Sequence, residues 1–348
     1  MRGVIGLDIG GVNTKAVWRE AEPVTSRRRG RSDASRTVVR PYDVVRDRRA
    51  LTSVVRDVAA ELAPEPAELV ALTMTAELSD AFRTKREGVD FVLDAVEAAV
   101  PGRLLAFATP GKLVSLAQAR ASPLDVAAAN WMASALAVGA LHADALMLDV
   151  GSTTADVIPI AAGRVAAGGR NDLDRLLAGE LVYTGALRTN LATIASRVPV
   201  RGRWCPVASE LFAISADMHL ILGHLSPEAY ACPTPDGRAA SVECARERVA
   251  RLVCADTEQL GPGEVETIAA YLHAAQVRQI EAAARQVSTR FANAPGVVIF
   301  GAGAFLARAV TERLGRRVLE MPWSPAEREA APAAALAELA AAHLHASC

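Results

Sequence analysis

The sequence predicts an α/β protein of two units, each a β-sheet with helices, on the strength of one recurring feature. An apolar run ends in Asp8 and a glycine turn, and a similar run ends in Asp149 and a glycine turn 141 positions later (149 − 8). A third apolar run, near the C-terminus, ends in Gly301-Ala302-Gly303. Each run is typical of a buried strand, and glycine turns let backbone N–H groups close around an anion. Two such hairpins facing each other across a cleft would make a clamp for phosphate and metal.

Composition limits the classes of partner. The 348 residues are 51% hydrophobic and 22% charged, so the chain can bury a sizeable core, and its length favours two domains. A net charge of -1 gives no broad attraction for nucleic acid or an anionic membrane, so we expect small-molecule substrates. The five cysteines contain no C-x-x-C pair and indicate neither a disulfide framework nor a zinc site. No secretory signal is recognisable, and we expect a cytoplasmic protein without a membrane span; the sequence gives no oligomeric state.

The first unit is expected over residues 1–143. Strands are predicted at 4–9, 14–19, 37–40, 69–74 and 104–108, and helices at 46–62, 91–99, 113–119 and 125–141. Pro41 ends the third strand at a sheet edge. The arginine-rich segment 26–36 is expected to be a solvated hairpin tip, with contact to an acidic substrate as the alternative.

The second unit is expected over residues 144–330, followed by a C-terminal helix over 331–348 that packs back on the first domain. Strands are predicted at 144–150, 156–160, 163–167 and 296–300, and helices at 173–178, 212–222, 243–253 and 264–290. The alanine-rich faces of the two long helices suit packing rather than chemistry.

Candidate site residues gather at the turns and after the strands. The phosphate-binding candidates are Gly10, Gly11, Asn13, Thr14, Lys15, Gly151, Ser152, Thr153, Thr154, Gly301 and Gly303. The candidates for the catalytic base are Glu77, Asp80 and His219. Glu77 and Asp80 follow a strand, where ligands of open α/β sheets gather, but Ser79 and Asp80 are also good helix caps. His219 stands on an apolar helix, where a single histidine is more often structural.

The passage 168–188 combines glycines, polar residues and one tyrosine too closely for an ordinary core segment. The substrate-binding candidates there and before it are Asn130, Asp172, Glu180, Tyr183 and Arg188. The alternatives are a satisfied core amide for Asn130, a helix cap for Asp172 and a packed aromatic for Tyr183.

The two hairpins and the late Gly-x-Gly turn resemble the phosphate-1, phosphate-2 and adenosine elements of the actin, Hsp70 and sugar kinase superfamily. That resemblance implies two ribonuclease H-like domains with an interdomain cleft. A narrower resemblance rests on five stretches: Gly6-Leu7-Asp8-Ile9-Gly10-Gly11, Thr73-Met74-Thr75-Ala76-Glu77, Asp149-Val150-Gly151-Ser152-Thr153-Thr154, Gly179-Glu180-Leu181-Val182-Tyr183-Thr184-Gly185 and Ala216-Asp217-Met218-His219. Together they are similar to a small family related to hydantoinase A and oxoprolinase proteins, which includes the methanofuran synthases.

This resemblance implies a transferase that joins aminomethylfuran methyl diphosphate to the phenol of glutamyltyramine or tyrosine and releases pyrophosphate. The hairpins would hold the diphosphate, Asp8 and Asp149 would support Mg²⁺ through waters, and Lys15 would add positive charge. ATP would be bound only in the alternative, a small-molecule kinase or oxoprolinase-like hydrolase; a non-catalytic nucleotide sensor is a third possibility. Ser152 departs from the glycine common in hydantoinase-type proteins, and the basic insertion near Arg29 is a second departure.

Overall fold

The computed structural model describes residues 3–21, 35–63, 65–109, 111–291 and 295–346. The chain divides into two compact units. Unit 1 comprises Met1–Asp144, Ile160–Arg175 and Met321–Cys348, and unit 2 comprises Ala145–Pro159 and Leu176–Glu320. Most of the arginine-rich segment, including Arg29, lies outside the described residues.

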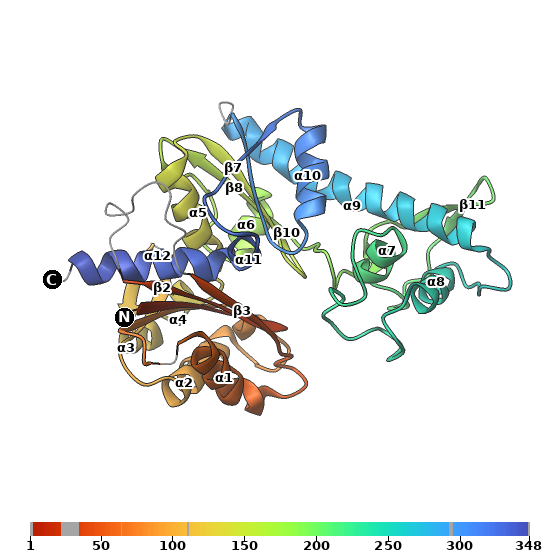
Figure 1. Ribbon diagram of the computed structural model, residues 1–348. Helices are drawn as coiled ribbons and strands as arrows, with labels where there is room; N and C mark the ends of the chain where they lie inside the picture. Colours follow the sequence, from red (N-terminus) through yellow and green to blue (C-terminus); the bar gives the residue numbers. More distant parts are fainter. Residues whose placement is uncertain (1–2, 22–34, 64, 110, 292–294, 347–348) are drawn as a thin grey trace. The chain divides into compact units, whose positions relative to one another are not determined.

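Unit 1 is built on a six-stranded sheet in the order β3-β2-β1-β4-β5-β6. Its strands are β1 (Gly3–Ile9), β2 (Asn13–Glu20), β3 (Arg36–Pro41), β4 (Leu69–Met74), β5 (Leu104–Ala108) and β6 (Lys112–Ser115). Strand β1 pairs antiparallel with β2, which pairs antiparallel with β3. On its other side β1 pairs parallel with β4, and β4 pairs parallel with β5. Three antiparallel strands followed by parallel crossovers form the ribonuclease H-like arrangement that the sequence predicts (Figure 1).

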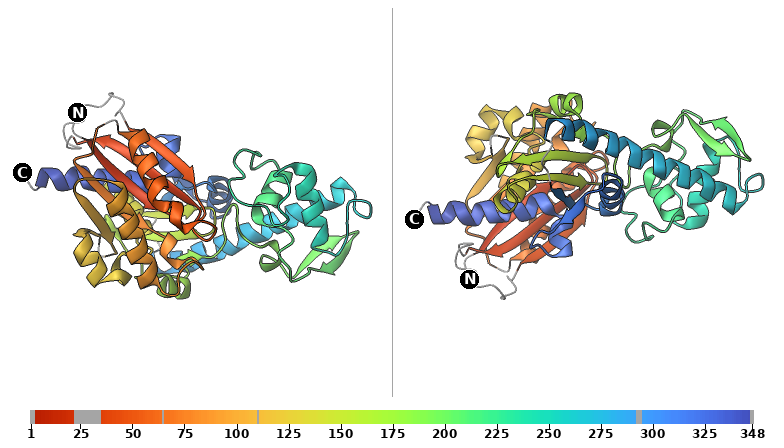
Figure 2. Two further views of the ribbon diagram at one scale, coloured as in Figure 1. Left: turned by 90° about the horizontal axis from the view of Figure 1, so that it is seen from below. Right: turned by 90° about the horizontal axis from the view of Figure 1, so that it is seen from above.

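Helices cover both faces of this sheet. The helices of unit 1 are α1 (Leu51–Leu62), α2 (Lys85–Ala99), α3 (Leu116–Ala121), α4 (Pro123–Val126), α5 (Asn130–Leu141), α11 (Pro325–Glu329) and α12 (Ala331–Ala346). Of these, α5 and α11 pack on α12. Ile5 and Leu7 of β1 pack in one core with the apolar faces of α1 and α2. Because side chains alternate along a strand, Gly6 faces the opposite side, where α12 lies. A Cβ on Gly6 would come within 2.0 Å of the Ala333 oxygen, so the helix rests on the strand backbone itself. Both views in Figure 2 show α12 along the first strands.

Unit 2 contains most of a second sheet, in the order β10-β8-β7-β13-β14, with β9 pairing β8. The strands are β7 (Ala145–Val150), β8 (Ala155–Ala161), β9 (Arg164–Val165), β10 (Leu181–Val182), β13 (Gly296–Phe300) and β14 (Arg317–Leu319), and a separate ribbon pairs β11 (Arg197–Val200) with β12 (Arg203–Pro206). The helices that follow α6 (Asp172–Ala178) are α7 (Ser215–Ile221), α8 (Val242–Arg251), α9 (Pro262–Arg290) and α10 (Ala304–Arg313). In Figure 1, α7 and α8 lie beside the first half of the long helix α9.

Several expected elements differ in the structure. Residues 112–115 form strand β6 instead of beginning a helix, because the chain turns at Gly111 (φ 82°) and pairs back on β5. The single helix expected over 125–141 is broken at Ala128, a non-glycine residue with φ 48°, into α4 and α5. Helix α1 starts at Leu51, after a short 3-10 turn. Of the strand expected over 163–167, only β9 forms.

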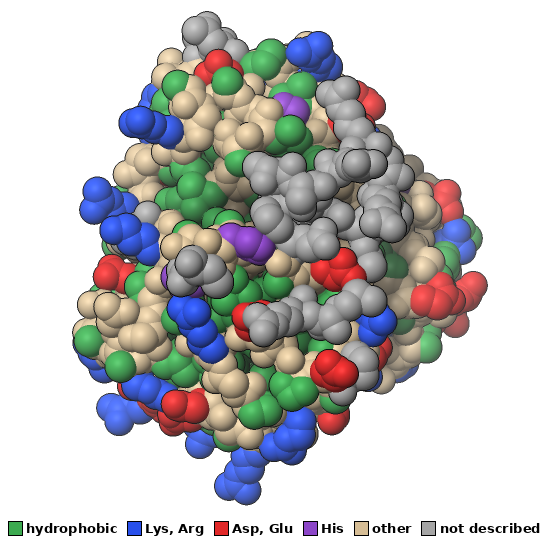
Figure 3. Space-filling view, turned by 60° about the vertical axis from the view of Figure 1, so that its left-hand side comes forward, with side chains coloured by type: hydrophobic (Ala, Val, Ile, Leu, Met, Phe, Trp, Pro, Cys, Tyr) green, Lys and Arg blue, Asp and Glu red, His purple; other side chains and the backbone are tan. Residues whose placement is uncertain are grey.

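The surface carries charges of both signs. The face drawn in Figure 3 carries both lysine or arginine and aspartate or glutamate side chains. Among the described residues, no helix is both long enough and apolar enough to span a bilayer.

Candidate functional site

The first hairpin, β1–β2, closes tightly around Gly10. The Gly10 N–H donates to the Asn13 oxygen at 2.9 Å, and a Cβ on Gly10 would lie 2.9 Å from that same oxygen. Asp8 stands opposite Lys15 in the ladder and is 7% exposed. The carboxylate that the sequence predicts as a metal ligand is therefore held at the mouth of a rigid turn.

Two hairpin residues have surroundings that the sequence did not indicate. The Lys15 ammonium donates to the backbone oxygen of Glu329, at 2.8 Å. Thr14 is fully buried, so its hydroxyl lies inside the unit. The ammonium has three donor hydrogens, so Lys15 can keep this carbonyl and still donate to a phosphate. Gly11 and Asn13 are half-buried at the turn.

The segment after β4 runs next to this hairpin. The Thr75 N–H donates to the Ile9 oxygen at 2.9 Å, and a 3-10 turn over Ala76–Leu78 follows. Glu77 lies in that turn and is 1% exposed, whereas Asp80 is exposed just beyond it. Asp80 is not a cap of α2, since the Thr84 hydroxyl accepts the Glu87 N–H there at 3.2 Å.

Glu77 is a buried carboxyl with an altered acidity. Desolvation by burial raises its pKa to about 8, and Asp172 adds to this effect. Its own backbone N–H, the N–H of Ala128 and the charge of Lys85 lower the pKa by less. Gly88 of α2 packs against it, since a Cβ there would lie 2.6 Å from the Glu77 Cα. A carboxyl whose pKa lies near neutrality can both take and give a proton, which marks it as a functional candidate.

Charged groups of unit 1 surround this carboxyl. Lys85 of α2 pairs with Asp172 at 2.8 Å, and the Arg175 guanidinium lies 3.7 Å from Asp172. Arg175 is 2% exposed and stacks 4.4 Å above the ring centroid of Trp131, the neighbour of Asn130 at the start of α5. The side chain of Asp172 thus pairs with cations, and Asn171 instead caps α6 by accepting the Asp174 N–H. Sequence reasoning singled out Asp172 but missed Lys85, which is 87 positions away, and Arg175, whose ring partner Trp131 is distant along the chain.

The second hairpin, β7–β8, is built within unit 2. Its turn closes with the Gly151 N–H donating to the Thr154 oxygen at 2.9 Å. The irregular segment that follows β10 wraps it: the N–H groups of Leu187 and Arg188 both donate to the Ser152 oxygen at 3.0 Å. Gly185 allows this approach, since a Cβ there would lie 2.5 Å from the Thr153 nitrogen.

The late glycine turn lies beside Asp149. Strand β13 pairs parallel with β7, which places Phe300 opposite Asp149. Gly301 has φ 86°, and a Cβ on it would lie 2.5 Å from the Asp149 Oδ1 atom. The Gly303 N–H donates to the Val150 oxygen at 2.8 Å. Within unit 2, the structure therefore brings together the predicted carboxylate and two of the predicted glycine turns.

The other candidates of the 168–188 passage take different environments. Glu180 is fully buried and pairs with Arg290 at 3.0 Å, so its carboxylate joins β10 to the end of α9. Tyr183 is 62% exposed and is not a packed core aromatic. Tyr183 and Arg188 are exposed on either side of the segment that wraps the second hairpin, where both can reach a ligand.

His219 is fully buried on α7 but is not isolated. Its ring lies 5.7 Å from the ring of His224 and 5.5 Å from that of His273, measured between centroids. This histidine group was missed because its members are 5 and 49 positions apart (224 − 219 and 273 − 224) and match no motif.

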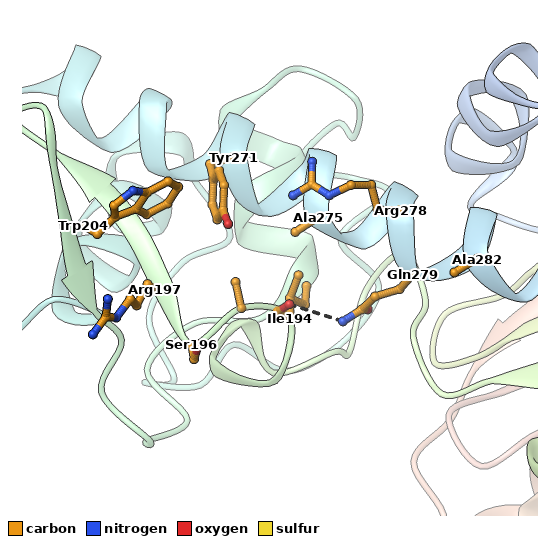
Figure 4. Close-up of a pocket in the computed structure, with 10 residues that line it drawn as sticks. Ile194, Ser196, Arg197, Trp204, Tyr271, Ala275, Arg278, Gln279 and Ala282 are labelled. Carbon is orange, nitrogen blue, oxygen red and sulfur yellow. Dashed lines mark hydrogen bonds between the residues drawn. The ribbon is translucent and has the colours of Figure 1, made fainter.

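A surface pocket lies elsewhere in unit 2, between α9 and the β11–β12 ribbon (Figure 4). Its volume is about 690 Å³, and its lining includes Arg197, Trp204, Tyr271 and Arg278. The Gln279 amide donates to the Ile194 oxygen at 3.3 Å across its floor. None of the predicted site residues lines this pocket.

Comparison with known proteins identifies the family. A family model described as Hydantoinase/oxoprolinase matches residues 68–343. The (4-{4-[2-(gamma-L-glutamylamino)ethyl]phenoxymethyl}furan-2-yl)methanamine synthase of Methanocaldococcus jannaschii is 32% identical over 310 residues, covering 86% of each chain. The chain belongs to this synthase branch of the hydantoinase/oxoprolinase family.

Further relatives of the family agree. A synthase of the same name from Methanococcus vannielii is 34% identical over 145 residues, which cover 42% of this chain and 64% of its own. Among solved structures, a nucleotide-free acetone carboxylase aligns with a TM-score of 0.52 and 14% identity, over 96% of this chain and 70% of that chain. The latter similarity shows the fold alone, and with the sheet topology it confirms the expected two-unit α/β class.

Proposed function

We propose that this enzyme forms the ether bond between a furan-methyl carbon and a phenol oxygen, and that its electrophile is a furfuryl-type diphosphate. The observation that supports the proposal is the 32% identity to a synthase over 86% of both chains. The name of that relative describes a phenoxymethyl group on a furan that also carries a methanamine. Making that bond requires a leaving group on the furan-methyl carbon and a phenol as nucleophile.

The bond changes balance without a further reactant. The bond between carbon and diphosphate oxygen breaks, and the diphosphate leaves with the electron pair. The phenol oxygen attacks the furan-methyl carbon, and the phenol proton passes to a base. Most of the acceleration would come from stabilising the leaving diphosphate and positioning the phenol.

The two glycine hairpins suit the leaving group. Backbone N–H groups in such turns bind phosphate oxygens. The Gly10 and Gly151 N–H groups close the two turns, so a phosphate would meet the N–H groups that follow them. We propose that a glycine hairpin of this kind binds the leaving diphosphate.

Mg²⁺ fits the carboxylates beside the hairpins. Asp8 and Asp149 supply oxygen donors, the kind that Mg²⁺ prefers, and one or two carboxylates plus phosphates are its usual protein ligand set. When bound, Mg²⁺ would neutralise charge that develops on the departing diphosphate. Each aspartate, Asp8 or Asp149, would hold an ion beside its own hairpin, and the N–H groups of that hairpin would orient the phosphate.

We propose Glu77 as the base. A phenol has a pKa of about 10, and a carboxyl with a pKa of about 8 accepts its proton more readily than an ordinary glutamate does. Tyr183 and Arg188 are exposed beside the second hairpin and would contact the phenolic acceptor, with Arg188 suited to a carboxylate of that acceptor.

The test is a reconstitution with purified chain, Mg²⁺, an aminomethylfuran methyl diphosphate and glutamyltyramine or tyrosine. We expect ether product by mass spectrometry and one pyrophosphate for each ether formed. Reactions without the phenol, and reactions in which ATP replaces the diphosphate, are the controls. ATP hydrolysis that depends on an added small acid, with no ether, would instead favour the oxoprolinase-like alternative and refute the proposal.

A further inference from the structure

Three of the six histidines of the chain gather at one place in unit 2. His219 is on α7, His224 follows the end of that helix, and His273 is on α9. One ring nitrogen from each of them lies within 4.8 Å of the other two. The centroids of the His224 and His273 rings are 4.6 Å apart.

The hydrogen bonds of Gln276 fix which nitrogen of His219 carries the proton. The Gln276 Nε2 group donates to the Thr184 hydroxyl at 2.9 Å and to the Gly185 oxygen at 2.8 Å. The Gln276 Oε1 atom is therefore an acceptor, and the His219 Nε2–H donates to it at 3.0 Å. His219 Nδ1 is left with a lone pair, and it is a buried nitrogen without a hydrogen-bond partner among the described residues. A ligating histidine whose second nitrogen donates to an oxygen is the usual arrangement in protein metal sites.

The other two imidazoles are also suited to ligation. His273 Nδ1 is likewise buried without a hydrogen-bond partner in the described part of the chain. Desolvation, together with the nearby imidazoles, lowers the pKa of His219 to about 3 and that of His273 to about 4. Desolvation also lowers the pKa of His224. All three rings are thus neutral at pH 7, and a neutral imidazole is the form that binds metal.

We propose that His219, His224 and His273 form a binding site for one divalent transition-metal ion of the zinc class. Nitrogen ligands favour zinc and its neighbours over Mg²⁺, which prefers oxygen. Tetrahedral zinc with Zn–N distances of about 2.1 Å needs ligand nitrogens about 3.4 Å apart. The three ring nitrogens now lie within 4.8 Å of one another, so binding requires them to move closer together. His224 is exposed and free of helix α7, so its side chain can make that movement.

The group has a closed side and an open side. The Phe305 ring packs against His219 at 4.7 Å and is stacked on His224 at 5.2 Å. His224 faces solvent, which gives the ion a route of entry and leaves a fourth position for water or an oxygen ligand. Three protein ligands with an open fourth position is the arrangement of reactive zinc sites rather than closed structural ones.

The metal site is joined to the second hairpin through Gln276. That amide connects His219 to Thr184 and Gly185, and Gly185 rests on the Thr153 backbone. Phe305 is two positions after Gly303 of the late glycine turn. A metal that orders His219 therefore also steadies the segment that supports the hairpin.

The experiment uses the full-length chain after chelator treatment and dialysis. Zinc bound per chain is measured by elemental analysis, and Co²⁺ is added as a visible probe of nitrogen ligation. We expect one ion per chain and the absorption bands of a four-coordinate Co²⁺ site. His224→Gln should weaken binding more than about 100-fold, because loss of a ligand exceeds the 10–100-fold effect of outer-shell substitutions.

The matched control is His345→Gln, at an exposed histidine of α12. It should bind zinc as the unchanged chain does. His273→Gln is the second variant, and circular dichroism confirms that each variant is folded. No stoichiometric zinc in the folded unchanged chain, or equal binding by His224→Gln and His345→Gln, would overturn the proposal. Zinc should also raise the thermal midpoint of the unchanged chain and not that of His224→Gln.

Discussion

Replacing Glu77 by glutamine removes a buried group whose protonation couples folding to pH. The carboxyl has a pKa of about 8 in the folded chain, against 4.5 as its ordinary value, mainly because burial disfavours its charged form. Between these values the folded chain holds one proton that the unfolded chain has released. The free energy of unfolding therefore falls as pH rises through this window.

The size of the effect follows from the width of the window. Each unit of pH within it lowers the free energy of unfolding by about 1.4 kcal/mol, so the unchanged chain loses about 3 kcal/mol between pH 5 and pH 7 from this group. Glutamine does not titrate. The free energy of unfolding of Glu77→Gln should therefore not fall in this way. Between pH 5 and pH 7 it should rise by about 3 kcal/mol relative to that of the unchanged chain.

Urea unfolding at pH 5, 6 and 7 measures the difference. Glu65→Gln is the matched control, since Glu65 is exposed, and its curve should run parallel to that of the unchanged chain. The ether-forming rate of Glu77→Gln should fall at the same time, on the order of 100-fold for a lost general base. A Glu77→Gln stability curve parallel to that of the unchanged chain would refute the assigned pKa.

Three further outcomes follow from the geometry. Gly185→Ala should lower the free energy of unfolding by about 1–3 kcal/mol, because the new Cβ would lie 2.5 Å from the Thr153 nitrogen. It should also weaken pyrophosphate binding, measured by calorimetry. The control Gly263→Ala, at an unobstructed position of α9, should change neither quantity. Arg248→Met should lower the free energy of unfolding by about 3–5 kcal/mol, because it leaves the fully buried Asp217 carboxylate without its cation. An unchanged urea midpoint would contradict this. Asp149→Asn should lower the ether-forming rate on the order of 100-fold and raise the Mg²⁺ requirement, while leaving thermal stability nearly unchanged.

The sequence predicted the regular elements that have strong local signals. The strands around Asp8 and Asp149 formed where the apolar runs indicated, because a buried parallel strand is continuous in hydrophobicity. Ala128 could not be anticipated as a break, since it carries no glycine or proline signal. The chain instead pairs with a distant strand at this point, through a parallel bridge between Ala127 and Met74. The helix expected at 113–119 starts only at Leu116, as α3, because pairing of β6 with β5 overrides the local helix preference of residues 113–115.

The site was harder to predict because its contacts join distant parts of the sequence. Asp172 was recognised as unusual, but its pairing with Lys85 spans 87 positions. Lys15 fits a phosphate-binding motif, yet its donation to the Glu329 oxygen depends on a segment 314 positions away. The histidine group has the same character, since α9 brings His273 to His219 only once the helices pack.

The contact between α12 and Gly6 has a consequence for how the chain folds during synthesis. Strand β1 leaves the ribosome long before the helix that lies on its backbone, which is made after residue 330. All of unit 2 is translated in between, and at a typical 5–20 residues per second that delay is on the order of half a minute. Throughout that interval the face of the first sheet that α12 covers is exposed in the nascent chain. Removal of α12 should therefore yield aggregates rather than a shorter folded protein.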